Sequence, residues 1–193
     1  MDITSLQATL HPEDEALRSV RARVGQAVEV PDVGTGALLA HVADQHGVRH
    51  AVVAGSAGGI ATAWLLAGMV DRGIVTCIEA DGRRHALMTD ALGDLGIGDH
   101  VRLIHGDPVE TSRRLSDSNY DLVLLQGPDL TADLVDTAAR LLKVGGVVVV
   151  RAEGEVDDAA ADALAASPWV QQVALDSDGG IVICLRDHDE DEA

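Results

Sequence analysis

A strict alternation of apolar runs with amphipathic segments, from His50 onward, constrains the fold of this chain more than any other feature. Continuous apolar runs such as Leu122–Leu125 and Val147–Val150 are typical of parallel strands that are covered on both faces. The alternation therefore predicts right-handed βαβ units in an open, doubly wound sheet. The expected strands are 50–54, 74–79, 101–105, 120–125 and 146–151, and the expected helices are 58–70, 82–95, 108–117, 131–142 and 156–166.

The two ends of the chain depart from this alternation. Runs at 169–175 and 181–185 are separated by a turn too short for a helix, which predicts an antiparallel hairpin. Before His50, a helix from Pro12 to about Gly25 and another at 34–45 are expected. The predicted fold class is α/β: a Rossmann-like sheet of seven strands, mostly parallel with a C-terminal antiparallel hairpin, plus N-terminal helices.

Length and composition limit the number of domains and the classes of partner. The 193 residues suit one domain over 1–186, with N-terminal helices in 1–48, a core in 49–186 and an acidic, disordered tail at 187–193. A net charge of −18 argues against a nucleic-acid partner. No run approaches the roughly 20 apolar residues of a membrane span, and Met1–Thr4 does not begin a signal peptide. We expect a cytoplasmic protein that does not bind membranes, with Cys77 and Cys184 as buried, reduced thiols.

A glycine-rich turn follows the first predicted strand and leads directly into a helix. Gly55, Gly58 and Gly59 would let backbone N–H groups and a helix N-terminus approach a ligand. Twenty-four residues after Gly55, the second strand ends in Glu79, where an acid typically accepts the ribose hydroxyls of a nucleotide-like cofactor. Two plainer interpretations stay open: the glycines serve only strand–helix packing, and Glu79 is a solvated residue at a strand tip.

Together these motifs resemble the class I S-adenosylmethionine-dependent methyltransferases, and more narrowly the O-methyltransferases of the catechol and caffeoyl-CoA type. The resemblance covers about residues 30–186. It rests on the turn at 55–59, Val75-Thr76-Cys77-Ile78-Glu79-Ala80-Asp81, His105-Gly106-Asp107, Tyr120-Asp121-Leu122-Val123-Leu124-Leu125, and Leu141-Leu142-Lys143-Val144-Gly145-Gly146. It implies S-adenosylmethionine as cofactor, a small-molecule acceptor and a homodimer.

The resemblance also implies roles for individual residues. By position, the cofactor's methionine part would lie against the turn, its ribose at the strand-tip acid and its adenine against the segment after the third strand. The matching residues are Gly55, Ser56 and Gly59; Glu79 and Ala80; and Gly106, Asp107 and Pro108.

This chain departs from the family at two places. Val53 and Ala57 stand where the family has an acid before the turn and a glycine inside it. Where the family holds a divalent cation with an acid after the fourth strand and an Asp-Asn pair after the fifth, this chain has Gln126, Arg151 and Ala152. Because hard cations need oxygen ligands, and carboxylates supply most of the binding charge, we expect no metal here.

The residues at these positions allow more than one role. Arg151, with Gln126 beside it, could act in catalysis by orienting an acidic or phenolic substrate oxygen. Alternatively, Arg151 forms an ion pair with Asp129 or Asp107. Asp107 is also typical of a helix cap. His105 could titrate as a general base, although a lone strand-tip histidine is more often structural.

Three functions remain open from the sequence. The first is an S-adenosylmethionine-dependent O-methyltransferase that works without metal. The second is a catalytically inactive relative that binds S-adenosylmethionine or S-adenosylhomocysteine. The third is an NAD-dependent oxidoreductase, against which the terminal hairpin and the Gly106-Asp107 segment argue.

Overall fold

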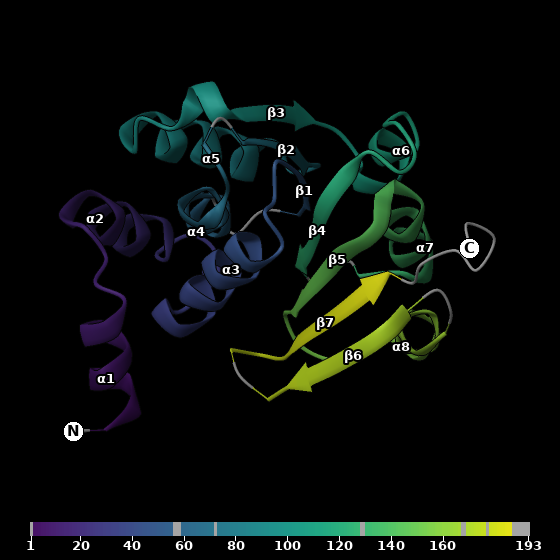
Figure 1. The fold of residues 1–193 in the computed structure, drawn as a ribbon. Helices are drawn as coiled ribbons and strands as arrows, with labels where there is room; N and C mark the ends of the chain where they lie inside the picture. The colour runs from purple at the N-terminus through teal and green to yellow at the C-terminus, as the bar shows by residue number, and fades with distance from the viewer. Residues whose placement is uncertain are drawn as a thin grey trace.

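Seven strands of the described chain form one sheet in the order β3-β2-β1-β4-β5-β7-β6, as Figure 1 shows. The computed structural model describes residues 2–55, 59–71, 73–127, 130–166, 169–176 and 178–186. Strands β1 to β5 run parallel, whereas β7 is antiparallel to both β5 and β6. The strands are β1 (His50–Ala54), β2 (Ile74–Glu79), β3 (Val101–His105), β4 (Tyr120–Gly127), β5 (Leu142–Ala152), β6 (Trp169–Leu175) and β7 (Ile181–Arg186).

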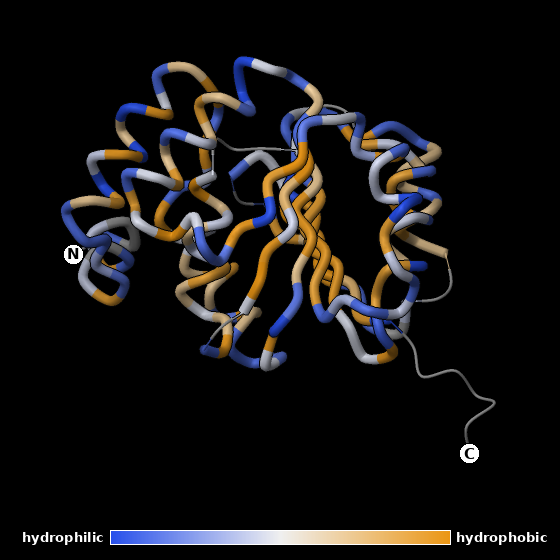
Figure 2. The backbone as a smooth tube through the Cα atoms, turned by 90° about the horizontal axis from the view of Figure 1, so that it is seen from above, coloured by the Kyte–Doolittle hydropathy of each residue, from blue (hydrophilic) through white to orange (hydrophobic). Residues whose placement is uncertain are grey.

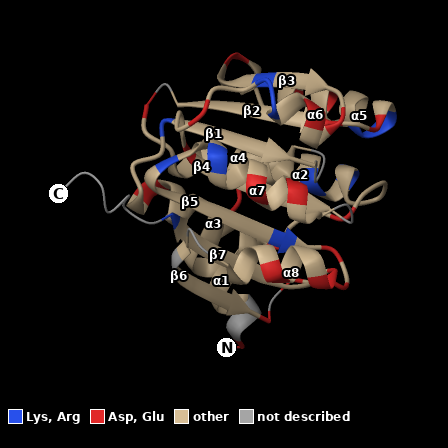
Figure 3. Ribbon diagram, turned by 90° about the vertical axis from the view of Figure 1, so that its right-hand side faces the viewer, with Lys and Arg blue, Asp and Glu red and all other residues tan. Residues whose placement is uncertain are grey.

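Helices cover both faces of the sheet. One face packs against α2, α3, α4 and α5, and the other against α7 and α8. Acidic residues lie on α6, α7 and α8, which face the viewer in Figure 3. The helices are α1 (Ile3–Leu10), α2 (Glu15–Val24), α3 (Val33–Gln45), α4 (Ile60–Gly68), α5 (Gly82–Asp94), α6 (Pro108–Ser112), α7 (Ala132–Leu141) and α8 (Asp158–Ala165), with a short 3₁₀ turn η1 (Gly98–His100).

The central strands contain continuous apolar runs because both of their faces are buried. In β4, Leu122 and Leu124 pack into the core on one face, while Val123 and Leu125 pack into the core on the other. Figure 2 shows these hydrophobic strands lying between the two helical layers. The predicted fold class, a mostly parallel seven-stranded sheet with a C-terminal antiparallel hairpin, is confirmed.

Three details differ from the sequence-based expectation. Helix α1 was not expected. Strand β5 begins at Leu142 rather than 146, because Tyr120 pairs with Leu142 and Leu122 with Val147, which leaves a bulge between them. Helix α6 ends at Ser112 rather than 117, since the Arg140 guanidinium donates to the Ser112 carbonyl oxygen at 2.7 Å and so satisfies the helix end.

Two tryptophans and two cysteines lie in the core of the described residues. Trp64 and Trp169 are buried, and the Trp169 indole N–H donates to the Ala163 carbonyl oxygen at 3.3 Å. Cys77 and Cys184 are free, buried thiols. No described helix combines the length and the hydropathy needed to cross a membrane. The predicted acidic tail at 187–193 lies outside the described residues.

Candidate functional site

A cavity of about 310 Å³ lies where the carboxyl ends of β1, β2, β4 and β5 meet the start of α6. Its lining draws on every segment that the cofactor prediction used and that the structure describes. Parallel α/β sheets bind ligands at this edge. The lining residues are Ala54, Gly55, Glu79, Ala80, Arg84, Asp107, Pro108, Val109, Gln126, Gly127, Thr131, Leu134 and Glu153.

The backbone at Gly55 requires glycine. Its φ is +81°, and a Cβ atom there would lie 1.9 Å from the carbonyl oxygen of Gln126. The Gln126 side-chain amide donates to the Gly55 carbonyl oxygen at 3.2 Å, which joins the ends of β1 and β4. Gly59, also at positive φ, precedes α4 and does not line the cavity. Ser56 and Ala57 lie outside the described residues.

Glu79 is a buried carboxylate, not a solvated strand tip. Its side chain is 1% exposed, and Oε1 accepts hydrogen bonds from the Asp81 backbone N–H at 2.7 Å and from Arg84 Nε at 3.1 Å. Arg84 therefore lies beside the predicted ribose acid, and with Ala80 it lines the cavity. Sequence reasoning missed Arg84, although its place in the first turn of α5, directly after the strand-tip acid, could have indicated it.

Two of the three residues predicted to lie against the adenine line the same cavity. Asp107 caps α6 by accepting a hydrogen bond from the Glu110 N–H at 2.8 Å, and it also lines the cavity with Pro108, so both of its proposed roles are compatible. Gly106 does not line the cavity; its N–H donates to the Glu79 carbonyl oxygen at 3.0 Å. His105 Nε2 lies 3.0 Å from the Ala80 carbonyl oxygen, which favours its structural role.

Arg151 lies among three carboxylates and is only 1% exposed. Nε donates to Asp178 at 2.9 Å, Nη1 donates to Glu153 at 2.8 Å, and Nη2 donates to Glu29 at 3.3 Å. The predicted pairing with Asp107 is wrong, since Asp107 caps α6; the other predicted partner, Asp129, lies outside the described residues. Two of the three acids, Asp178 and Glu29, come from distant segments of the chain and not from neighbouring strand tips.

Burial and the ion pairs shift the pKa values of Arg151 and Glu153. Burial lowers the pKa of the Arg151 guanidinium, but the hydrogen bond and charge of Asp178, together with the charges of Glu153 and Glu29, outweigh this and raise it overall. Burial raises the pKa of Glu153 above its ordinary value, and Arg151 offsets only part of that effect. Arg151 does not line the cavity, whereas Glu153 does. The geometry thus favours the structural interpretation of Arg151 over an acceptor-binding one.

The three positions that match the family's metal ligands carry no carboxylate. Gln126 is 8% exposed and offers an amide, Arg151 a cation, and Ala152 no polar side chain. The Arg151 guanidinium, on β5 directly opposite Gln126 on β4, brings a positive charge to this edge of the sheet. These residues do not fit a hard divalent cation.

A second cavity, of about 590 Å³, adjoins the first. Arg84 and Glu153 line both cavities, so these two side chains lie at the junction between them. Ala27, Val28 and Leu87 give the second cavity apolar walls, and charged side chains complete its lining: Glu29, Asp81, Arg83, Arg84 and Glu153.

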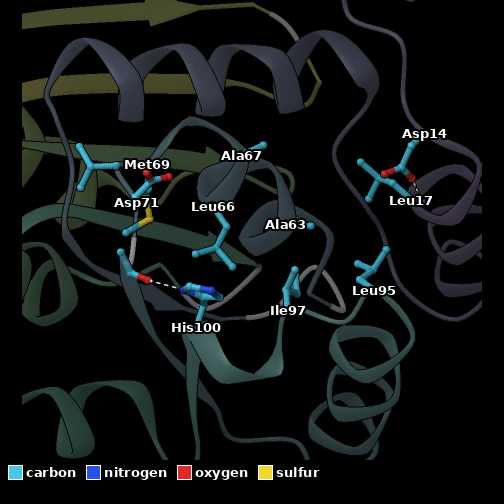
Figure 4. Close-up of a pocket in the computed structure, with 12 residues that line it drawn as sticks. Asp14, Leu17, Ala63, Leu66, Ala67, Met69, Asp71, Leu95, Ile97 and His100 are labelled. Carbon is cyan, nitrogen blue, oxygen red and sulfur yellow. Dashed lines mark hydrogen bonds between the residues drawn. The ribbon is translucent and has the colours of Figure 1, made fainter.

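A third cavity, of about 400 Å³, lies between α2, α4 and η1 and is drawn in Figure 4. Its lining is mostly apolar, with the His100 ring Nδ1 lying 3.1 Å from the Gly73 carbonyl oxygen. Gly73 immediately precedes β2, so this cavity lies near the amino end of the sheet, away from the edge that carries Glu79. It contains none of the residues predicted to bind the cofactor.

Comparison with known families decides the class. A family model described as a methyltransferase domain matches residues 52–151. The chain belongs to this family. Residues 52–151 of this methyltransferase-domain protein include the glycine turn, Glu79, the Asp107 segment and the ends of β4 and β5.

Individual relatives agree with this membership. Proteins named "Probable O-methyltransferase" from Mycobacterium tuberculosis and "Putative O-methyltransferase" from Mycobacterium marinum are 36% identical to this chain over 143 residues. The match covers 72% of this chain but only 63% of each relative, so the chain spans less than two thirds of their length.

Solved structures share the fold at lower identity. An O-methyltransferase from Bacillus cereus in complex with S-adenosylhomocysteine has a TM-score of 0.81 at 18% identity, covering 95% of this chain and 96% of the other. The O-methyltransferase TomG from Streptomyces achromogenes, in complex with S-adenosylmethionine, has a TM-score of 0.77 at 20% identity, covering 95% of each chain.

Proposed function

We propose that this chain is an S-adenosylmethionine-dependent O-methyltransferase that methylates a hydroxyl group of a small-molecule acceptor without a divalent metal. The observation that carries the proposal is the cavity at the carboxyl edge of the sheet, which joins Gly55, Glu79 and Asp107 in one lining. Family membership, the names of the relatives and the cofactor-bound structural neighbours support the same conclusion.

The lining offers a partner for each part of the cofactor. The Glu79 carboxylate, which lines the cavity, would accept the ribose hydroxyls. The segment from Asp107 to Val109 would enclose the adenine. The methionine part would then lie against Gly55 and Gln126 at the other end.

Bound S-adenosylmethionine would supply an electrophilic methyl group, which bonds to the acceptor oxygen as its bond to sulfur breaks and the hydroxyl proton leaves to a base or to water. The chain's own task is to place the two reactants in line and to exclude water. We place the acceptor in the adjoining cavity, because Arg84 and Glu153 line both spaces and the apolar walls at Ala27, Val28 and Leu87 suit a small organic molecule.

Metal-free transfer follows from the side chains at the family's metal positions. Of these three side chains, Arg151 and Ala152 offer no oxygen ligand and Gln126 offers only a neutral amide oxygen. We therefore derive no step through a metal ion. The homodimer and the cytoplasmic location stay predictions.

Isothermal titration with S-adenosylmethionine, S-adenosylhomocysteine and NAD tests the cofactor, followed by methyl transfer to a panel of hydroxylated acceptors in EDTA. We expect binding of the first two ligands, no binding of NAD, and turnover that EDTA does not remove. Binding without turnover of any acceptor would favour the catalytically inactive alternative. Binding of NAD alone would favour the oxidoreductase.

A further inference from the structure

Glu153 is the acidic side chain of the Arg151 cluster that reaches the cofactor cavity. The cluster consists of Arg151, Glu29, Glu153 and Asp178. One guanidinium faces three carboxylates, so with all groups ionised the cluster carries two surplus negative charges. Neither Glu29 nor Asp178 lines the cofactor cavity, whereas Glu153 lines both this cavity and the adjoining one.

A second, independent feature at the same end of the cavity indicates a ligand that donates hydrogen bonds. Gln126 is more than nine-tenths buried; its Nε2 donates to the Gly55 carbonyl oxygen, but its Oε1 has no hydrogen-bond partner among the described residues. A buried acceptor left without a donor costs free energy, and a bound donor removes that cost. Gln126 lies near the end of β4, where it pairs with Arg151 of β5, and Glu153 directly follows β5.

The position of this end within the cavity identifies the part of the ligand. If Glu79 holds the ribose and Asp107 lies at the adenine, the methionine part would lie against the lining residues at the ends of β1, β4 and β5, which include Gly55, Gln126 and Glu153. That part of S-adenosylmethionine carries an ammonium group and a sulfonium, both cationic. S-adenosylhomocysteine keeps the ammonium group but has a neutral thioether in place of the sulfonium.

We propose that Glu153 is the electrostatic partner of the cofactor's sulfonium and makes this site favour S-adenosylmethionine over its demethylated product. This inference rests on the proposed function and deepens it. Arg151 acts here as a positioning residue: its Nη1 holds Glu153 Oε1 at 2.8 Å, and two further carboxylates offset the guanidinium charge that would otherwise neutralise Glu153. A side chain that is only 17% exposed is weakly screened by water, so its charge acts over the whole junction.

The same arrangement assists product release. Once the methyl group has left, the sulfur is neutral and its attraction to the Glu153 carboxylate is lost. The ammonium contact is unchanged by the reaction. The affinities for S-adenosylmethionine and S-adenosylhomocysteine should therefore differ by the attraction between the sulfonium and Glu153, and binding measurements can detect that difference.

The test compares binding of the two ligands to wild type and to matched variants by isothermal titration. Glu153→Gln keeps the shape of the side chain and its acceptor for Arg151 but removes the charge. We expect S-adenosylmethionine affinity to fall about tenfold and S-adenosylhomocysteine affinity to change by less than about twofold, a modest loss for a charge contact in a partly buried site.

Asp178→Asn is the matched control. It removes the same charge from the same guanidinium, but Asp178 lines neither cavity, and asparagine tolerates the positive φ of 50° found there. We expect the ratio of the two affinities to stay within about twofold of the wild-type ratio. Glu153→Asp, which restores the charge, should recover most of the preference and keeps the test valid if Glu153→Gln fails to fold.

The possible results separate this inference from the proposed function. If wild type binds neither ligand, both are overturned. If wild type binds both ligands but Glu153→Gln weakens them equally, or weakens neither, the role of Glu153 is overturned and the cofactor assignment stands. An equal shift of the ratio in Asp178→Asn would also overturn it, because the effect would then be the charge of the cluster as a whole.

Discussion

Replacing Arg151 with methionine removes the cation from a cluster that contains three acids. Methionine has a similar length and no charge, so the variant retains most of the packing volume on β5. The side chains of Glu153 and Asp178, 17% and 13% exposed, then lose the guanidinium that donates a hydrogen bond to each of them. The third partner, Glu29, has a side chain 57% exposed and can turn into water.

The expected loss of stability comes from the two partly buried acids, Glu153 and Asp178. Removing one partner of a buried ion pair costs about 3–5 kcal/mol, because the remaining charge is left without a partner. The exposed pair with Glu29 adds little, since water screens it. Each kcal/mol shifts the melting temperature of a domain of this size by about 2–4 °C, so Arg151→Met should melt roughly 6–20 °C below wild type at pH 7. Circular dichroism or scanning calorimetry measures the shift.

The loss should also depend on pH. Burial already raises the pKa of Glu153 above its ordinary value of 4.5, with Arg151 opposing, and removal of Arg151 should raise it further. An acid whose pKa is higher in the folded than in the unfolded state costs stability as the pH rises through the interval between the two values. The deficit of Arg151→Met should therefore shrink as the pH falls from 7 toward about 5.

The double variant Arg151→Met with Glu153→Gln is the control for this reasoning. It removes the charge that the single variant leaves stranded, so it should melt at a higher temperature than Arg151→Met alone. A single variant that melts within about 2 °C of wild type, or a deficit that does not change with pH, would refute the interpretation of Arg151 as a structural cation.

Four further outcomes test other parts of the site and the core. Glu79→Ala should weaken S-adenosylhomocysteine binding by about 1.5–3 kcal/mol in a calorimetric titration, the range for a charged hydrogen bond; unchanged affinity would remove Glu79 from the site. EDTA should leave thermal stability and any transferase activity unchanged, and activity that returns only with Mg²⁺ would contradict the metal-free proposal. Gly55→Ala should lower the melting temperature and abolish cofactor binding, because its Cβ would meet the Gln126 carbonyl oxygen at 1.9 Å. Cys77, a buried thiol whose pKa burial raises to about 12, should react with a thiol reagent only after unfolding; fast labelling in the native protein would show that β2 opens.

The strands of this protein are predictable from sequence because their burial leaves a local signature. The central strands β1, β4 and β5 each contain a continuous apolar run, and β1, β2 and β3 begin and end at the predicted residues. The start of β5 was missed because Lys143, Gly145 and Gly146 are polar or glycine and form a bulge that only the partner strand β4 explains. Helix α6 was predicted too long because its end depends on Arg140, which comes from α7.

Site residues could be predicted from the sequence only where the neighbouring residues along the chain indicate their role. Gly55 could be placed because a turn after an apolar run requires glycine, and Glu79 because it ends a strand. The partners of Arg151 could not be found in this way. Glu29 lies 122 residues away along the chain and Asp178 27 residues away, and only the folded sheet brings the N-terminal segment and the hairpin turn to the end of β5.

An arginine at the end of β5 would be costly if it stood alone, because a buried guanidinium without countercharge loses its hydration. Here three separate segments each supply an acid to it: the loop before α3 supplies Glu29, the residue after β5 supplies Glu153, and the β6–β7 turn supplies Asp178. The Asp178 carboxylate also accepts a hydrogen bond from the Asp32 N–H at 3.3 Å, and Asp32 in turn caps α3. The cation therefore joins the N-terminal segment, the central sheet and the hairpin at one point. Because Arg151 does not line the cofactor cavity whereas Glu153 does, we expect loss of Arg151 to reduce stability first and to reduce cofactor affinity only through Glu153.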